Sequence, residues 1–93
     1  MTLPEIEMLR EEIDKIDSKL LQLLNERSKL ALEIGEIKKK YNLPVYDPER
    51  EKKIMERLLK ENTGPLENSA IIRLFERIID EARRLERIRA KGD

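Results

Sequence analysis

The first part of the chain carries a continuous helical pattern of apolar residues. From residue 6 to residue 41 they recur at intervals of three, four or seven, which places them on one helix face. They are Ile6, Leu9, Ile13, Ile16, Leu20, Leu23, Leu30, Ile34, Ile37 and Tyr41. No proline interrupts the pattern before Pro44, and Gly35 is a single break that a helix tolerates. The pattern therefore predicts one very long helix over about residues 3–40.

The start and the length of this helix carry further information. Thr2 and Glu5 stand at the spacing of a capping box, and Pro4 suits a first helical turn. At a rise of 1.5 Å per residue the helix would be over about 50 Å long. The rest of a 93-residue chain is too small to cover an apolar stripe of that length. A second copy of the chain is the economical partner, so the pattern predicts a homodimer.

A connector and a second, short helix follow. The residue before Pro44 avoids the helical region, which predicts extended backbone there. Asp47 suits an N-cap and Pro48 the first helical position, while Asn62-Thr63-Gly64-Pro65 stops the helix. The predicted elements are a connector over 41–47, a helix over about 48–61 and a loop over 62–66.

The third helix is of medium length. Its apolar positions are Ile71, Ile72, Phe75, Ile78, Ile79, Ala82, Leu85 and Ile88. They predict a helix over about 67–89, followed by a frayed tail from Ala90 to Asp93. No strand, repeat or low-complexity tract is recognisable. The fold class expected is all-α, with one very long, one short and one medium helix in a single domain over 1–93.

Composition excludes several classes of function. Lys+Arg and Asp+Glu number 20 each, and this zero net charge argues against a nucleic-acid-binding protein. The chain has no Cys and no His, so it lacks thiolate ligands, the commonest metal ligand and the commonest general base. We expect no metal site. No secretory signal pattern or membrane-spanning run occurs, so we expect a cytoplasmic protein without membrane contact.

Two cations interrupt the apolar stripe of the first helix. Arg27 occupies the position between Leu23 and Leu30 where an apolar residue is expected, and Lys38 follows at nearly the same angle. The two lie about 16 Å apart along the helix axis, so their long side chains can lean toward a common point. Arg27 could instead extend to solvent or pair with an acid.

Other charged residues allow a similar choice of explanations. Arg10 lies about 25 Å from Arg27, too far to share a small ligand within one chain. Its symmetry mate in an antiparallel dimer could reach that ligand, although the pattern alone favours an ordinary surface position for Arg10. Asp47 is explained as an N-cap, with Arg50 and Glu51 in the same first turn. Glu86 continues the row of Ile72 and Ile79, where an apolar residue is expected, and helix-end fraying is an equally good explanation. Several cations converging on one pocket would suit a small dicarboxylate, because guanidinium groups bind carboxylates through two parallel hydrogen bonds.

These residues also resemble a known family in their order and spacing. The matching segments are Leu9-Arg10-Glu11-Glu12-Ile13, Leu20-Leu21, Glu26-Arg27 through Leu30-Ala31, Glu33-Ile34-Gly35 with Lys38, Pro44-Val45, Asp47 through Arg50-Glu51, Arg73-Leu74-Phe75 and Ile78-Ile79. Together they resemble the free-standing, all-helical chorismate mutases. The resemblance implies an intertwined homodimer with two sites, each built from both chains. It also implies an isomerase (an intramolecular transferase) that converts chorismate to prephenate in phenylalanine and tyrosine biosynthesis, without cofactor or metal.

The resemblance further implies a role for each site residue. Arg10 of the partner subunit and Arg27 would bind the two substrate carboxylates, and Lys38 the ether oxygen and a carboxylate. Asp47 and Glu51 would lie near the ring hydroxyl, with Arg50 in support. Two positions depart from the common bacterial pattern, because Ala82 stands where Ser is frequent and Glu86 where Gln often donates to the ether oxygen. Glu86 must therefore be protonated to donate. The expected catalytic residues are Arg27, Lys38, Glu51 and Glu86, with Arg10, Asp47, Arg50 and Ala82 completing the substrate-binding set.

Two alternatives remain at this stage. An isochorismate-pyruvate lyase would use a similar cationic pocket, although Arg50-Glu51 fits the mutase better. A non-catalytic helical dimerisation module would explain the long stripe, but it gives no reason for Arg27, Lys38 and Glu86 to interrupt apolar rows.

Overall fold

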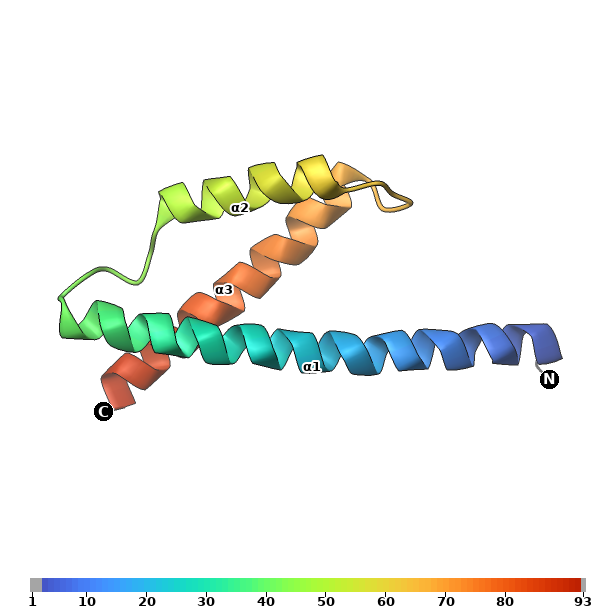
Figure 1. Ribbon diagram of the computed structural model, residues 1–93, viewed down its shortest axis with the longest axis horizontal. Coiled ribbons are helices and arrows are strands. Elements are labelled where there is room, and N and C mark those ends of the chain that lie inside the picture. The colour runs from blue at the N-terminus through green and yellow to red at the C-terminus, as the bar shows by residue number, and fades with distance from the viewer. Residues whose placement is uncertain (1–2, 93) are drawn as a thin grey trace.

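The computed structural model describes residues 3–92, which form three helices without a strand (Figure 1). Helix α1 spans Pro4–Lys40 (37 residues), α2 spans Pro48–Glu61 (14 residues) and α3 spans Asn68–Gly92 (25 residues). The predicted all-helical class, with a long, a short and a medium helix in that order, is confirmed.

Local interactions define both ends of α1. Pro4 is the first helical residue, as predicted, and Leu3 occupies the N-cap position without a side-chain hydrogen bond. Thr2, the other member of the predicted capping box, lies outside the described residues. At the other end Asn42 adopts a positive φ of 61°, and the Leu43 N–H donates to the Lys38 carbonyl over 2.7 Å. This is the Schellman arrangement, which ends a helix and redirects the chain.

Side-chain caps define α2. The Asp47 carboxylate accepts a hydrogen bond from the Arg50 N–H over 3.1 Å, so Asp47 is the predicted N-cap, with Pro48 following it. After α2 the Asn62 amide donates to the Leu66 carbonyl over 2.9 Å and accepts from the Gly64 N–H over 3.0 Å. These bonds satisfy backbone groups in the turn that leads into α3.

The predicted end of α3 is wrong. The tail from residue 90 was expected to fray, but α3 continues through Ala90 and Lys91 to Gly92. Alanine and lysine are strong helix formers, and basic residues in the last turn interact favourably with the helix dipole. Asp93 lies outside the described residues.

Helix α3 crosses the molecule and packs against both other helices, whereas α1 and α2 do not pack against each other (Figure 1). The described chain measures 56 × 30 × 16 Å, and the N-terminal half of α1 extends away from α2 and α3. Among residues 3–91 only Ile54, Ile79 and Glu86 are buried, and none of these lies on α1. Every member of the predicted α1 stripe is exposed, as shown by Leu20 at 51%. This chain by itself therefore leaves the long stripe uncovered.

In the part of the chain that the structure describes, no helix is both long enough and apolar enough to cross a membrane.

Candidate functional site

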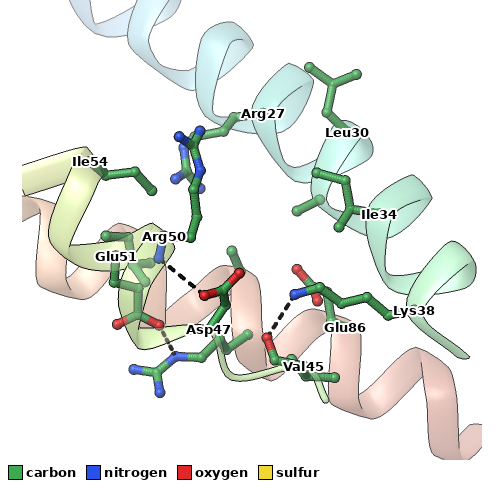
Figure 2. Close-up of a pocket in the computed structure, with 14 residues that line it drawn as sticks. Arg27, Leu30, Ile34, Lys38, Val45, Asp47, Arg50, Glu51, Ile54 and Glu86 are labelled. Carbon is green, nitrogen blue, oxygen red and sulfur yellow. Dashed lines mark hydrogen bonds and ion pairs between the residues drawn. The ribbon is translucent and has the colours of Figure 1, made fainter. Parts of the chain in front are cut away.

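A pocket of about 290 Å³ lies where the C-terminal half of α1, the connector, the first turns of α2 and the second half of α3 meet (Figure 2). Its apolar lining comes from Leu30, Ala31, Ile34, Val45, Ile54 and Ile79. Its remaining walls contain the predicted site residues Arg27, Lys38, Asp47, Arg50, Glu51, Ala82 and Glu86. The chain thus brings together residues of all three helices that lie up to 59 positions apart, counting from Arg27 to Glu86.

Helix α1 contributes the two cations that interrupt its apolar stripe. Arg27 and Lys38 are half-buried, and Figure 2 shows both side chains entering the pocket from α1. The Lys38 ammonium donates a hydrogen bond to the Val45 carbonyl over 2.9 Å. This bond ties the end of α1 to the connector and holds the ammonium at the pocket wall. An ammonium has three N–H donors, so two remain for a ligand.

The first turn of α2 contributes the acidic side of the pocket. Asp47 serves both as the N-cap and as a lining residue, because its carboxylate bonds the Arg50 N–H and also borders the pocket (Figure 2). One turn further, the half-buried Glu51 lines the same wall. Its carboxylate approaches the guanidinium of Arg83 on α3, with 3.4 Å between Glu51 Oε2 and Arg83 Nε.

Helix α3 crosses α1 at Glu86, and a glycine allows the close approach. A Cβ atom at Gly35 would lie only 3.1 Å from Glu86 Cγ, so any larger residue there would crowd Glu86. Glu86 is only 9% exposed, and its Oε2 is buried without a hydrogen-bond partner in the described chain. Burying a polar atom without a partner costs free energy.

Electrostatic effects on Glu86 act in opposite directions. Burial raises the pKa of the Glu86 carboxyl above its ordinary value of 4.5, and the nearby Lys38 and Arg27 charges lower it by a smaller amount. On its other side Glu86 faces Glu36 and Lys39 of α1 and Arg89 of α3 across a small cavity. Because burial has the largest effect, the folded chain holds the proton on Glu86 to a higher pH than an exposed glutamate would.

Arg10 is the one predicted site residue that lies elsewhere. It stands on the isolated N-terminal half of α1, where it pairs with Glu7 over 3.5 Å and its side chain is 61% exposed. Seventeen residues, or about 25 Å, separate it from Arg27 along the helix. This agrees with the expectation that Arg10 cannot reach a ligand held by Arg27 of the same chain.

Arg83 lines the pocket but was missed by the sequence analysis. It stands four residues after Ile79 and three before Glu86, and so interrupts the same face of α3. The signal was therefore present in the spacing. Arg83 was overlooked because it lies within the charged segment Glu81–Arg84, where one more charged residue does not break the pattern.

The arrangement suits recognition of a small anion that also carries hydrogen-bonding groups. Two cations on α1 face carboxyl groups on α2 and α3, and one of these has a pKa raised by burial. Over residues 3–92 no three His, Cys, Asp or Glu side chains gather as metal ligands would. The pocket offers positioning and electrostatic stabilisation.

Comparisons with known proteins agree on one family. The family model described as chorismate mutase type II matches residues 9–87. A bifunctional chorismate mutase/prephenate dehydratase of Aquifex aeolicus is 46% identical over 87 residues, covering 89% of this chain and 24% of that protein. A chorismate mutase of Methanocaldococcus jannaschii is 37% identical over 87 residues, covering 85% of this chain and 81% of that protein. The chain thus spans about a quarter of the length of its bifunctional relative and most of the length of the other.

Solved structures are similar over nearly the whole chain. Form II of the chorismate mutase from Thermus thermophilus has a TM-score of 0.88 and 38% identity, covering 89% of this chain and 94% of that one. The chorismate mutase from Helicobacter pylori, solved in complex with prephenate, has a TM-score of 0.85 and 31% identity, covering 95% and 94%.

Proposed function

Since the chain belongs to the chorismate mutase type II family, we propose that it converts chorismate to prephenate, as an isomerase of phenylalanine and tyrosine biosynthesis. One observation carries the proposal most directly. The residues that resemblance to this family assigns to the site, Arg10 excepted, line a single pocket. The H. pylori relative was solved with prephenate, the product of this reaction.

The reaction breaks one C–O bond as one C–C bond forms within the same molecule, so the protein needs to supply conformation and charge. Chorismate carries two carboxylates, and cations that hold both ends favour the compact conformer in which the reacting carbons meet. Arg27 supplies one such cation by its position in the pocket. Lys38 would bind the ether oxygen and a carboxylate, and its bond to Val45 orients the ammonium before the substrate arrives. An oriented donor needs no rearrangement as negative charge grows on the ether oxygen.

Glu86 would supply the second donor to that oxygen. In its protonated form it carries one O–H, and Oε2 is the buried atom that has no partner within the described chain. Ionised Glu86 would instead repel the ether oxygen. The burial that raises its pKa therefore favours the form that the reaction requires.

The acidic residues of α2 would bind the ring hydroxyl. Glu51 is the better candidate for a side-chain bond, because one Asp47 oxygen already accepts the Arg50 N–H as a helix cap. Arg50 lines the pocket from the same turn and would support the bound carboxylates.

We infer an intertwined homodimer from the exposed stripe of α1. Pairing two α1 helices antiparallel would cover the apolar residues that one chain leaves exposed. A register that brings Arg10 of the partner subunit beside Arg27 places the two-fold axis midway between them, about at Ser18 and Lys19. The same register sets Ile16 opposite Leu21 and Ile13 opposite Leu24, which are apolar pairs. Each site would then take its last cation from the other chain.

The two alternative functions fit less well. A lyase acting on isochorismate would share the scaffold, but the matching family and the relatives described above are chorismate mutases. A dimerisation module would not require a buried carboxyl with an unpartnered oxygen at the wall of a pocket.

The first test is turnover. Purified protein should remove the absorbance of chorismate and yield prephenate, while Arg27→Ala should leave chorismate unchanged at the same concentration. Isochorismate in a parallel assay separates the lyase. Absence of turnover of chorismate by the wild type, over a broad range of pH and temperature, would exclude the mutase.

A mixing experiment tests the shared site. Arg10→Ala and Arg27→Ala should each be inactive, because every site in either homodimer lacks one cation. Unfolding and refolding them together should recover about a quarter of wild-type activity, since half of the dimers are mixed and each has one intact site. No recovery despite confirmed mixed dimers would show that Arg10 and Arg27 do not serve the same site across the two chains.

A further inference from the structure

We propose that Arg83 is a positioning residue that holds the Glu51 carboxylate at the pocket wall and leaves one of its oxygens for a substrate hydroxyl. The proposal rests on the function proposed above for its kinetic consequences. Its structural part, the placement of Glu51 by Arg83, stands on the geometry of this chain.

The pair formed by Arg83 and Glu51 differs from the other ion pairs of residues 3–92. Those others join residues three or four positions apart on one helix, whereas this pair joins α3 to α2. The Arg83 and Glu51 side chains are only 25% and 26% exposed, so solvent screens their attraction less than at the surface. Contact across two helices fixes a side chain relative to the fold, which a pair within one turn of helix does not.

Arg83 is itself held from two other directions. Its guanidinium pairs with Asp80 one turn earlier on α3, and lies 4.9 Å from the ring centre of Tyr46 in the connector. Its Nε is buried and makes no hydrogen bond within the described chain, so the carboxylate of Glu51 is the group that compensates it. Asp80 and Tyr46 therefore hold the Arg83 guanidinium in place, and the guanidinium in turn can hold the Glu51 carboxylate.

The contact also gives the two oxygens of the Glu51 carboxylate different surroundings. Oε2 lies 3.4 Å from Arg83 Nε, and Oε1 accepts no hydrogen bond from residues 3–92. Glu51 lines the pocket, so Oε1 can accept a hydrogen bond from a hydroxyl group of a bound ligand. Without Arg83 the carboxylate could rotate toward solvent, and the ligand would have to order it on binding.

A double-mutant cycle separates positioning from a merely structural brace. Arg83→Met keeps much of the side-chain bulk and removes the charge, and we expect kcat/KM to fall about tenfold. Arg83→Lys should restore part of that loss. In a Glu51→Ala background Arg83→Met should have no further effect on kcat/KM. The matched control is Arg77→Met on the same helix, because Arg77 is 78% exposed and pairs with Glu81 outside the pocket; it should match the wild type.

Two kinetic outcomes would overturn the proposal. An equal loss in the wild-type and Glu51→Ala backgrounds would mean that Arg83 acts on the substrate directly. A lower melting temperature for Arg83→Met with unchanged kcat/KM would mean that it only joins α2 to α3.

A structural arm keeps the proposal testable if chorismate is not a substrate. Crystal structures of the wild type and Arg83→Met should show the Glu51 carboxylate leaving the pocket wall in the variant. Glu51 in the same position in both would refute the placement, whatever the activity. If Arg83→Met does not fold, Arg83→Lys and Tyr46→Leu serve the same comparison. Arg83→Lys replaces the guanidinium by an ammonium, and Tyr46→Leu removes the ring against which the guanidinium lies, so both keep a cation at this position.

Discussion

Glu86 makes a strong prediction about pH, because it is a buried carboxyl in a site that needs a donor. The perturbation is Glu86→Gln, which keeps the shape of the side chain and supplies an amide donor at every pH. In the wild type the donor exists only while Glu86 is protonated. We therefore expect wild-type kcat/KM to fall as pH rises through the Glu86 titration, and the variant to lose that decline.

The sign follows from the surroundings of the carboxyl. Burial raises the Glu86 pKa above 4.5, and Lys38 and Arg27 oppose the rise without cancelling it. The folded state thus binds this proton more tightly than the unfolded chain. Stability from this group is fully present below the ordinary pKa of 4.5 and is lost as pH rises through the raised value. Glu86→Gln should remove this term, so the variant should gain stability relative to the wild type as pH increases.

The size of the kinetic effect follows from the loss of one hydrogen-bond donor. Glu86 lines the pocket, and its Oε2 has no hydrogen-bond partner in residues 3–92 that would compete with a ligand for the carboxyl proton. Loss of one such donor costs roughly 10²- to 10³-fold in rate, which sets the expected difference between the protonated and ionised limits. At the alkaline limit the variant should exceed the wild type by about that factor.

The assay is kcat/KM for chorismate from about pH 5 to pH 9 for both proteins, with urea unfolding at the same pH values. An unchanged pH profile in Glu86→Gln would refute the donor role. A flattened profile without a relative gain in stability would refute the account of burial.

Two further predictions concern the packing around the site, and a third concerns the pairing of two α1 helices. Gly35→Ala should gain helix propensity of up to about 1 kcal/mol, yet lower kcat/KM because the new Cβ, 3.1 Å from Glu86 Cγ, displaces that side chain; thermal melting and kinetics check the two effects separately. Arg27→Leu should abolish turnover while raising the free energy of unfolding by about 1 kcal/mol, because leucine continues the apolar row; a stabilised variant that stays active would favour the dimerisation module. If two chains pair through α1 as proposed, Leu20→Glu should leave an inactive monomer, because it places two charges near the two-fold axis, whereas Gln22→Glu on the opposite face should change neither association nor activity; light scattering after gel filtration checks this.

The order and the approximate bounds of the helices could be predicted from the spacing of apolar residues and from the capping residues. The three-and-four spacing on α1 and α3 predicts helices with one apolar face, and Asp47 followed by Pro48 starts α2 at the predicted residue. The end of α3 could not be placed in the same way. Ala90 and Lys91 are compatible with both a helix and a frayed tail, and no proline or earlier glycine decides between them.

Some site residues can be recognised from the sequence because they differ from their neighbours, and others cannot. Arg27 and Glu86 stand out because a charge in an apolar row is costly unless it is used. Arg83 lies among other charges, so only the tertiary contact with Glu51 reveals it. Gly35 was not recognised because the residue that packs against it, Glu86, lies 51 positions away, and no local sequence pattern indicates such a contact.

The length of α1 connects the fold to the proposed chemistry. A 93-residue chain buries little, and here the pocket has α1 on one side only, with half of that helix projecting free of the other elements. Antiparallel pairing would place the N-terminal half of each α1 against the pocket-bearing half of its partner. The apolar stripe would then supply the association energy, and Arg10 at its far end would supply the missing cation. On this account a shorter α1 would lose both together, so stability of the dimer and completeness of the site should fail at the same truncation.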